Sequence, residues 1–183
     1  MEQARIDPAS QPLAGALLSG GPAPGSGPEL AAFGQFVGDW VLRWSGRDST
    51  GTHTVTMDGT LSVGWILGGT AVQDVWAVPL LGQRPAGGLA GFHGTTVRFY
   101  DPGIGAWRST WIDPPNARVR RFVGRIVGAD IELVSDEEEP LLRWRFSQIT
   151  GDSFVWTGEI RPGRDADWSL QQEVRASRGE PRG

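Results

Sequence analysis

The sequence predicts one all-β domain, a single up-and-down antiparallel β-barrel of about ten strands with a short helix ahead of it. The chain has 183 residues, of which 39% are hydrophobic, and this is enough to build one core. From Val37 onward, β-branched and aromatic residues recur in short alternating runs. Gly, Pro, Asp and Asn separate these runs, with almost no helical pattern between them. We therefore expect the barrel domain to span 28–176.

The segment before this domain, 1–27, is dominated by Pro, Gly, Ala and Ser. Such a composition buries too little apolar surface to order itself, so we expect a flexible arm. The alternative is a lid, in which Leu13, Leu17 and Leu18 fold over the barrel mouth. The apolar stretch of the arm is too short for a secretory signal, and no run approaches the roughly 18 residues that cross a bilayer as a helix. These features predict a cytoplasmic protein without a membrane partner, and 177–183 are expected to form a disordered tail.

A short helix is expected over 28–36, just ahead of the first strand. Ser26 and Glu29 have the spacing of a capping box, in which the two side chains bond each other's backbone N–H groups. Pro28 falls in the first turn, where its fixed φ angle suits a helix. We expect this helix to plug or flank one end of the barrel.

The strands follow in order, separated by turn residues such as Gly68-Gly69 and Asp101-Pro102. Closing such a meander into a barrel removes its exposed edges. A β-sandwich is the competing architecture, but it usually needs a long crossover, and the longest loop between the expected strands is 79–90. We expect strands at 37–46, 52–66, 70–79, 91–100, 105–113, 118–127, 129–135, 141–149, 152–161 and 167–176.

Period-two alternation places one set of side chains inside the barrel. All nine tryptophans fall on the expected inner faces. A tryptophan buries on the order of 200 Å² and carries an N–H that needs an acceptor, so we expect a flat-walled apolar cavity with a few polar points. The alternative is an interior that side chains fill solidly. On the strand at 91–100 and on the last strand, the expected inner sets are His93, Thr95, Val97 and Phe99, and Trp168, Leu170, Gln172 and Val174. The expected ligand-lining residues are Trp44, Trp65, Trp76, Phe99, Ser109, Trp111, Trp144, Trp156 and Gln172.

Asp74 is the first candidate for acid–base chemistry. It lies between Val72 and Trp76 on an expected inner face, where a carboxyl group can act as a general acid or base. The alternative is a carboxylate that a tryptophan N–H or an arginine satisfies. His93 is a second catalytic candidate, although its glycine-flanked position also fits an exposed loop histidine, and His53 is in the same situation.

Charge and composition exclude several classes of function. A net charge of -4 and a pI near 5.2 disfavour nucleic acid and anionic membranes as partners. The chain contains no cysteine and no lysine, which excludes thiolate metal sites and Schiff-base chemistry. With two histidines, no metal site is indicated, and a haem ligand would have to be His53 or His93. We expect no metal and no cofactor.

Four short segments then carry a resemblance to a known family. Phe36-Val37-Gly38-Asp39-Trp40 is similar to the Gly-x-Trp motif on the first strand of lipocalin-like proteins. Over residues 33–176 the chain resembles an uncharacterised bacterial family of lipocalin-like domains. The segments that carry this resemblance are Gly38-Asp39-Trp40, Leu67-Gly68-Gly69-Thr70, Tyr100-Asp101-Pro102 with Gly105-Ala106-Trp107, and Thr110-Trp111-Ile112-Asp113. The resemblance implies a calycin-type barrel and no particular activity, because the family has no agreed one.

Two functions from different classes follow from these features. The first is a carrier or sequestering protein that binds a small hydrophobic or aromatic molecule between the inward tryptophans. The second is a cofactor-independent cyclase or isomerase in natural product biosynthesis, which uses the barrel as a shape template for a polyketide- or terpenoid-like substrate and Asp74 as its acid or base. The sequence leaves the oligomeric state open, with a homodimer among the options.

Overall fold

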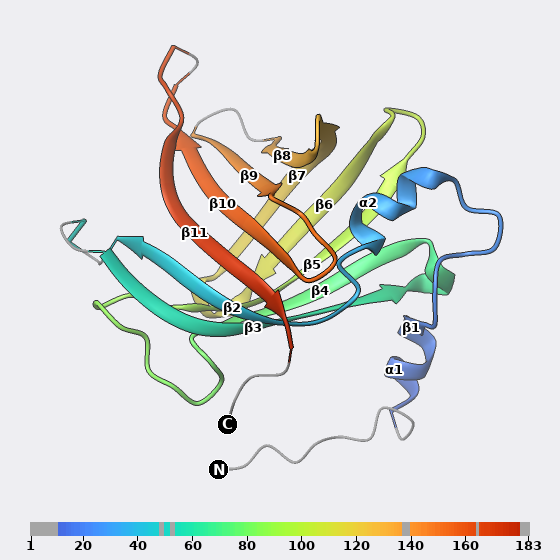
Figure 1. Cartoon of the computed structure of the whole chain (residues 1–183), viewed down its shortest axis with the longest axis horizontal. Helices are drawn as coiled ribbons and strands as arrows, with labels where there is room; N and C mark the ends of the chain where they lie inside the picture. The colour runs from blue at the N-terminus through green and yellow to red at the C-terminus, as the bar shows by residue number, and fades with distance from the viewer. Residues whose placement is uncertain (1–10, 48–49, 52–53, 137–139, 164, 180–183) are drawn as a thin grey trace.

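The computed structural model describes residues 11–47, 50–51, 54–136, 140–163 and 165–179, and it shows a closed antiparallel β-barrel (Figure 1). Each barrel strand pairs with its neighbours in sequence, and pairing of β11 with β2 closes the ring, so the predicted up-and-down barrel is confirmed. The strands lie within a few residues of their expected positions. They are β2 (Gly38–Arg47), β3 (Thr54–Ile66), β4 (Ala71–Val78), β5 (Phe92–Asp101), β6 (Ala106–Asp113), β7 (Arg118–Val127), β8 (Asp130–Ser135), β9 (Leu141–Ser147), β10 (Ser153–Arg161) and β11 (Ser169–Arg178).

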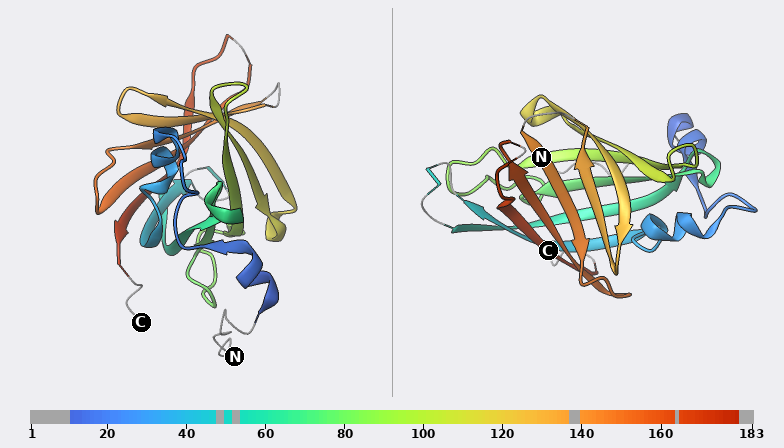
Figure 2. Two further views of the ribbon diagram at one scale, coloured as in Figure 1. Left: turned by 90° about the vertical axis from the view of Figure 1, so that its right-hand side faces the viewer. Right: turned by 90° about the horizontal axis from the view of Figure 1, so that it is seen from above.

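One end of the barrel is covered by the expected helical segment, which consists of the 3-10 turn η2 (Pro28–Leu30) and the helix α2 (Ala31–Gly34) (Figures 1 and 2). The predicted capping box does not form. The N-cap is Gly27, which has no side chain that could cap the helix. The Ser26 hydroxyl instead donates to the carbonyl of Ala23 at 2.7 Å. Ser26 therefore closes the preceding turn, and the helix is held by the packing of its apolar face.

Part of the expected flexible arm is ordered in the structure. It forms the helix α1 (Pro12–Leu17) and the two-residue strand β1 (Leu18–Ser19), which pairs with Ile66 and Trp65 at the end of β3. Leu13 and Leu18 are 75% and 54% exposed, and Leu17 is half-buried. The arm lies at the end of the barrel that holds α2, away from the half that contains the cavity.

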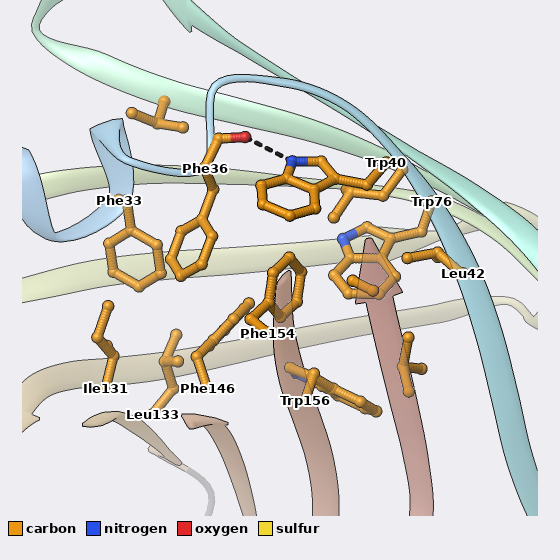
Figure 3. Close-up of a cluster of buried hydrophobic side chains, with 14 of the residues drawn as sticks. Phe33, Phe36, Trp40, Leu42, Trp76, Ile131, Leu133, Phe146, Phe154 and Trp156 are labelled. Atoms are coloured by element: carbon orange, nitrogen blue, oxygen red, sulfur yellow. Dashed lines mark hydrogen bonds between the residues drawn. The ribbon is translucent and has the colours of Figure 1, made fainter. Parts of the chain in front are cut away.

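The barrel half beneath α2 is filled with aromatic rings (Figure 3). Phe33, from α2, packs edge-on against Trp107 with ring centroids 4.8 Å apart. Phe36 and Trp40 both pack against Phe154, at 4.9 and 4.8 Å. The Trp40 indole N–H donates to the carbonyl of Phe36 at 2.7 Å, which fixes the chain where it enters β2.

Trp65 belongs to this closed half rather than to a ligand site. A Cβ atom on Gly34 would lie 2.5 Å from Cζ2 of the Trp65 ring. The absence of a side chain at Gly34 therefore lets the helix rest directly on the indole, and this contact joins α2 to the end of β3.

The inner face predicted for β5 is wrong, because the side chains that point inward are those between the predicted ones. Phe99 is 45% exposed and His93 is also exposed, whereas Thr96 and Arg98 are buried. The reason is an ion pair across the β4–β5 ladder, in which the buried Asp74 on the inner face of β4 takes Arg98 as its partner. A buried carboxylate needs such a partner, and it outweighs the apolar preference of Phe99 for the interior.

The expected inward position of Trp168 is also wrong, although the other eight tryptophans belong to the interior core or pack against it. Trp168 packs against the guanidinium groups of Arg143 and Arg161, which are 4.6 and 4.8 Å from its ring. The β10–β11 register shifts here, so that Gln172 pairs with Gly158 but Leu170 pairs with the next residue of β10. The one-residue bulge reverses the alternation, and Leu170 is accordingly 56% exposed.

Candidate ligand-binding cavity

The barrel half opposite α2 contains a cavity of about 420 Å³. Its lining comes from the strand ends far from the helix, including Phe92 at the start of β5, Asp113 at the end of β6 and Ile160 near the end of β10. A volume of this size lies within the range of small-molecule sites in proteins, roughly 300–1,000 Å³. The two halves of one barrel are therefore built differently, one filled and one hollow.

Indole rings form much of the cavity wall. Trp76 and Trp156 have ring centroids 5.8 Å apart, Trp156 and Trp144 are 5.5 Å apart, and Trp144 and Trp111 are 6.0 Å apart. Phe92 extends this series, with its ring 6.1 Å from that of Trp111. The result is a connected aromatic surface of the kind that the sequence predicts, facing a space large enough for a planar guest.

The wall also carries polar residues, most of which sequence reasoning missed. Arg118 and Arg120 alternate with the buried Phe122 along β7, so period-two counting from Phe122 is the signal that finds them. No comparable signal marks the residues near the strand ends, because barrel closure brings them together. The polar lining residues are Thr96, Arg98, Asp113, Asn116, Arg118, Arg120, Glu159, Gln171 and Gln172.

Arg98 forms the floor of the cavity, and its ion-pair partner Asp74 lies beneath it. Both side chains are 3% exposed, Oδ2 of Asp74 accepts from Nη1 of Arg98, and Oδ1 accepts from the backbone N–H of Thr96 at 2.9 Å. The Arg98 guanidinium lies 4.9 Å from the ring centroid of Phe33 in the closed half. Arg98 lines the cavity on one side and a gap of only about 10 Å³ on the other. Asp74 lines the gap but not the cavity. The pair thus separates the two halves of the barrel.

The expected ligand-lining residues divide into two groups. The structure brings together five of them around the cavity: Trp76, Trp111, Trp144, Trp156 and Gln172. Trp44 stands behind this group, and its indole N–H donates to Oε1 of Gln172 at 2.8 Å, which orients that amide. Ser109 is 2% exposed and faces inward, but it does not line the cavity. Phe99 lies on the outer face, and Trp65 lies beneath α2.

Neither catalytic candidate faces the cavity. Asp74 lies below the floor with both carboxylate oxygens engaged, and His93 is exposed on the outer face of β5. His53 falls outside the residues that the structure describes. Within the described ranges, no group of three or more His, Asp or Glu side chains is arranged to hold a metal ion. None of the helices in this part of the chain has the length and apolar character to span a membrane.

The fold of this chain is a lipocalin-like β-barrel. Among solved structures it is similar to Rv2717c from M. tuberculosis, with a TM-score of 0.57 and 14% identity, over 84% of this chain and 99% of that one. It is also similar to the S-type phycobiliprotein lyase CPES from Guillardia theta, with a TM-score of 0.50 and 9% identity, over 82% and 92% of the two chains. No family model matches the chain, and no curated protein matches its sequence. At these identities the likeness establishes the fold alone.

Proposed function

We propose that this protein binds a small hydrophobic or aromatic molecule in the barrel cavity, as a carrier or sequestering protein. The observation that carries the proposal is the connected indole wall of Trp76, Trp156, Trp144 and Trp111 around about 420 Å³ of space. A flat aromatic wall gives a planar guest both apolar burial and ring–ring contact, which adds roughly 0.5–1.5 kcal/mol per aromatic pair beyond burial. One of the similar structures is named a phycobiliprotein lyase, but this activity does not transfer at 9% identity.

The cyclase or isomerase alternative lacks an observation of this kind. Its acid–base candidate, Asp74, has Thr96 and Arg98 as hydrogen-bond partners and lies beneath the cavity. Catalysis by shape alone would still begin with binding in the same cavity. Binding is therefore the function to test first.

A titration with 9-fluorenone, a planar tricyclic ketone that quenches tryptophan emission by energy transfer, tests the proposal. We expect saturable quenching in the wild-type protein. Trp144→Ala removes part of the cavity wall and should weaken the affinity at least roughly tenfold, because a buried aromatic contact is lost. Trp168→Ala makes the same substitution on the outer face and should leave the affinity unchanged. Equal affinities in the two variants, or no saturable binding to the wild type, would contradict the proposal.

A further inference from the structure

Gln172 presents a hydrogen-bond donor to the cavity. Its side chain lies on the wall, and its Oε1 accepts from the indole N–H of Trp44 at 2.8 Å. An indole N–H can only donate, so it fixes which end of the amide faces Trp44. The other end, the NH2 group on Nε2, has no hydrogen-bond partner among the described residues and is not buried. Trp44 therefore leaves the donor end of the Gln172 amide to the cavity.

This donor lies beside an indole ring of the wall. Gln172 pairs with Gly158 across the β10–β11 ladder, and both residues line the cavity. A Cβ atom on Gly158 would lie 3.1 Å from Nε2 of Gln172 and 2.9 Å from Cη2 of Trp156. The absence of a side chain at Gly158 thus gives the amide and the edge of the indole room to lie next to each other. A planar guest that packs on the Trp156 ring brings its own edge close to the Gln172 NH2 group.

The charged residues of the wall also favour an acceptor on the guest. Both oxygens of the Glu159 carboxylate accept from Arg143, at 2.6 and 2.9 Å. Oδ2 of Asp113 accepts from the Asn116 amide at 2.8 Å, and its Oδ1 is buried. The other charged lining residues are Arg98, Arg118 and Arg120. Because arginine carries only donors, an acceptor on the guest meets donors on this wall whether it is neutral or negatively charged.

We propose, resting on the function proposed above, that Gln172 selects planar aromatic ligands that carry a hydrogen-bond acceptor, such as a carbonyl oxygen, on one edge. The ring system packs on Trp156, and the acceptor receives a hydrogen bond from Nε2 of Gln172. Trp44 is a positioning residue, because its N–H holds the amide in the orientation that presents the donor.

Three tricyclic probes with nearly the same planar skeleton test this proposal: fluorene, 9-fluorenone and carbazole. Fluorene has no polar group, 9-fluorenone has only an acceptor, and carbazole has only a donor. Equilibrium dialysis measures the affinity of each probe without relying on its emission. A purely apolar cavity would bind fluorene most tightly, because it is the most hydrophobic of the three. We expect 9-fluorenone to bind roughly three- to tenfold more tightly than fluorene, and carbazole to bind no more tightly than fluorene.

A matched pair of glutamine variants locates the contact. Gln172→Met removes the amide and keeps a side chain of similar length, so it should weaken 9-fluorenone roughly three- to tenfold and leave fluorene unchanged. Gln73→Met is the control, because Gln73 alternates with the inward Asp74 on β4 and does not line the cavity. Its amide donates to the Thr95 hydroxyl at 2.9 Å, away from any guest. This variant should change neither affinity.

Trp44→Phe tests the positioning role. It removes the N–H that holds Oε1 of Gln172, so the amide can turn its carbonyl oxygen into the cavity and accept from a guest. The preference for 9-fluorenone over carbazole should then fall roughly three- to tenfold. A loss of stability alone would weaken the binding of all three probes alike and leave this preference unchanged.

The outcomes separate the two proposals. If fluorene binds the wild type as tightly as 9-fluorenone, or if Gln172→Met and Gln73→Met bind 9-fluorenone equally, the Gln172 proposal fails while binding in the cavity stands. An unchanged preference in Trp44→Phe would overturn the positioning role of Trp44. If none of the three probes binds the wild type, the proposed function itself fails, and the Gln172 proposal fails with it.

Discussion

The two halves of this barrel use aromatic residues in opposite ways. In one half the rings fill the interior, and in the other they line a cavity. Beneath α2, Phe33 and Phe36 enter from outside the sheet and fill the space between the strands, leaving a gap of only about 10 Å³. At the other end no helix of the described residues enters, and Trp144 and Trp156 line a cavity of about 420 Å³. A high aromatic content therefore does not by itself predict a cavity. The deciding feature is whether a segment outside the sheet fills the barrel end.

This contrast predicts where stability and binding reside. Rings in the closed half pack against one another and should contribute mainly to the free energy of unfolding. Rings on the cavity wall have space on one side, so their removal costs fewer contacts and should mainly affect ligand affinity. The Asp74–Arg98 pair lies at the boundary between the two halves and touches both.

The largest effect is expected from truncating the ring that fills the closed end. Phe33→Ala should lower the free energy of unfolding by about 3–5 kcal/mol, because Phe33 is 1% exposed and packs against Trp107 and Phe146. Phe92→Ala is the matched change on the cavity wall and should cost about 1 kcal/mol. Urea denaturation of the two variants checks the difference, and equal losses would mean that the two halves are not energetically distinct.

A second effect, of about 3 kcal/mol, is expected at the boundary between the halves. Asp74→Asn leaves the Arg98 guanidinium buried without a counter-charge, and breaking a buried ion pair from one side is strongly destabilising. Replacing both partners, in Asp74→Asn with Arg98→Met, removes the buried charge and should restore much of the loss. Urea denaturation of the single and double variants measures this coupling. A double variant less stable than Asp74→Asn would show that Arg98 stabilises the floor through its contacts with Phe33 instead.

The strand positions could be predicted because alternation and turn residues are local signals. The positions that failed depend on contacts between strands. The inward turn of Arg98 follows from its pairing with Asp74, more than twenty residues earlier in the chain, and the apolar Phe99 beside it gives the opposite local signal. The outward position of Trp168 follows from the bulge beside Gly158, which single-sequence counting does not reveal.

The candidate site could be predicted on its aromatic side and, among its polar residues, at Gln172. Trp76, Trp111, Trp144 and Trp156 follow from alternation on their own strands, and the structure places all of them on the wall. The polar side depends on register, since Asp113 joins Thr96 only through the pairing of β5 with β6. The helix over 28–36 was expected to plug or flank one end of the barrel, and α2 covers one end, but alternation does not indicate how far Phe33 and Phe36 fill the interior.

The smallest change in the free energy of unfolding is expected at Trp168. This residue lies outside the barrel and so belongs to neither the filled nor the hollow half. Its cation–π contacts with Arg143 and Arg161 are partly exposed, so Trp168→Phe should change the free energy of unfolding by less than about 1 kcal/mol. Hydrogen bonding to Glu159 raises the pKa of Arg143, so Arg143 stays charged and its ion pair holds the guanidinium beside the ring.

We therefore expect iodide to quench Trp168 far more than the inward indoles, and Trp168→Phe to remove most of the iodide-accessible emission. Trp156→Phe is the matched control, because Trp156 is 6% exposed and faces the cavity. Iodide quenching that falls equally in the two variants would mean that the register shift in β11 does not place Trp168 outside. Trp168 and Trp156 would then be in similar environments, whereas the structure places Trp168 outside the barrel and Trp156 inside it.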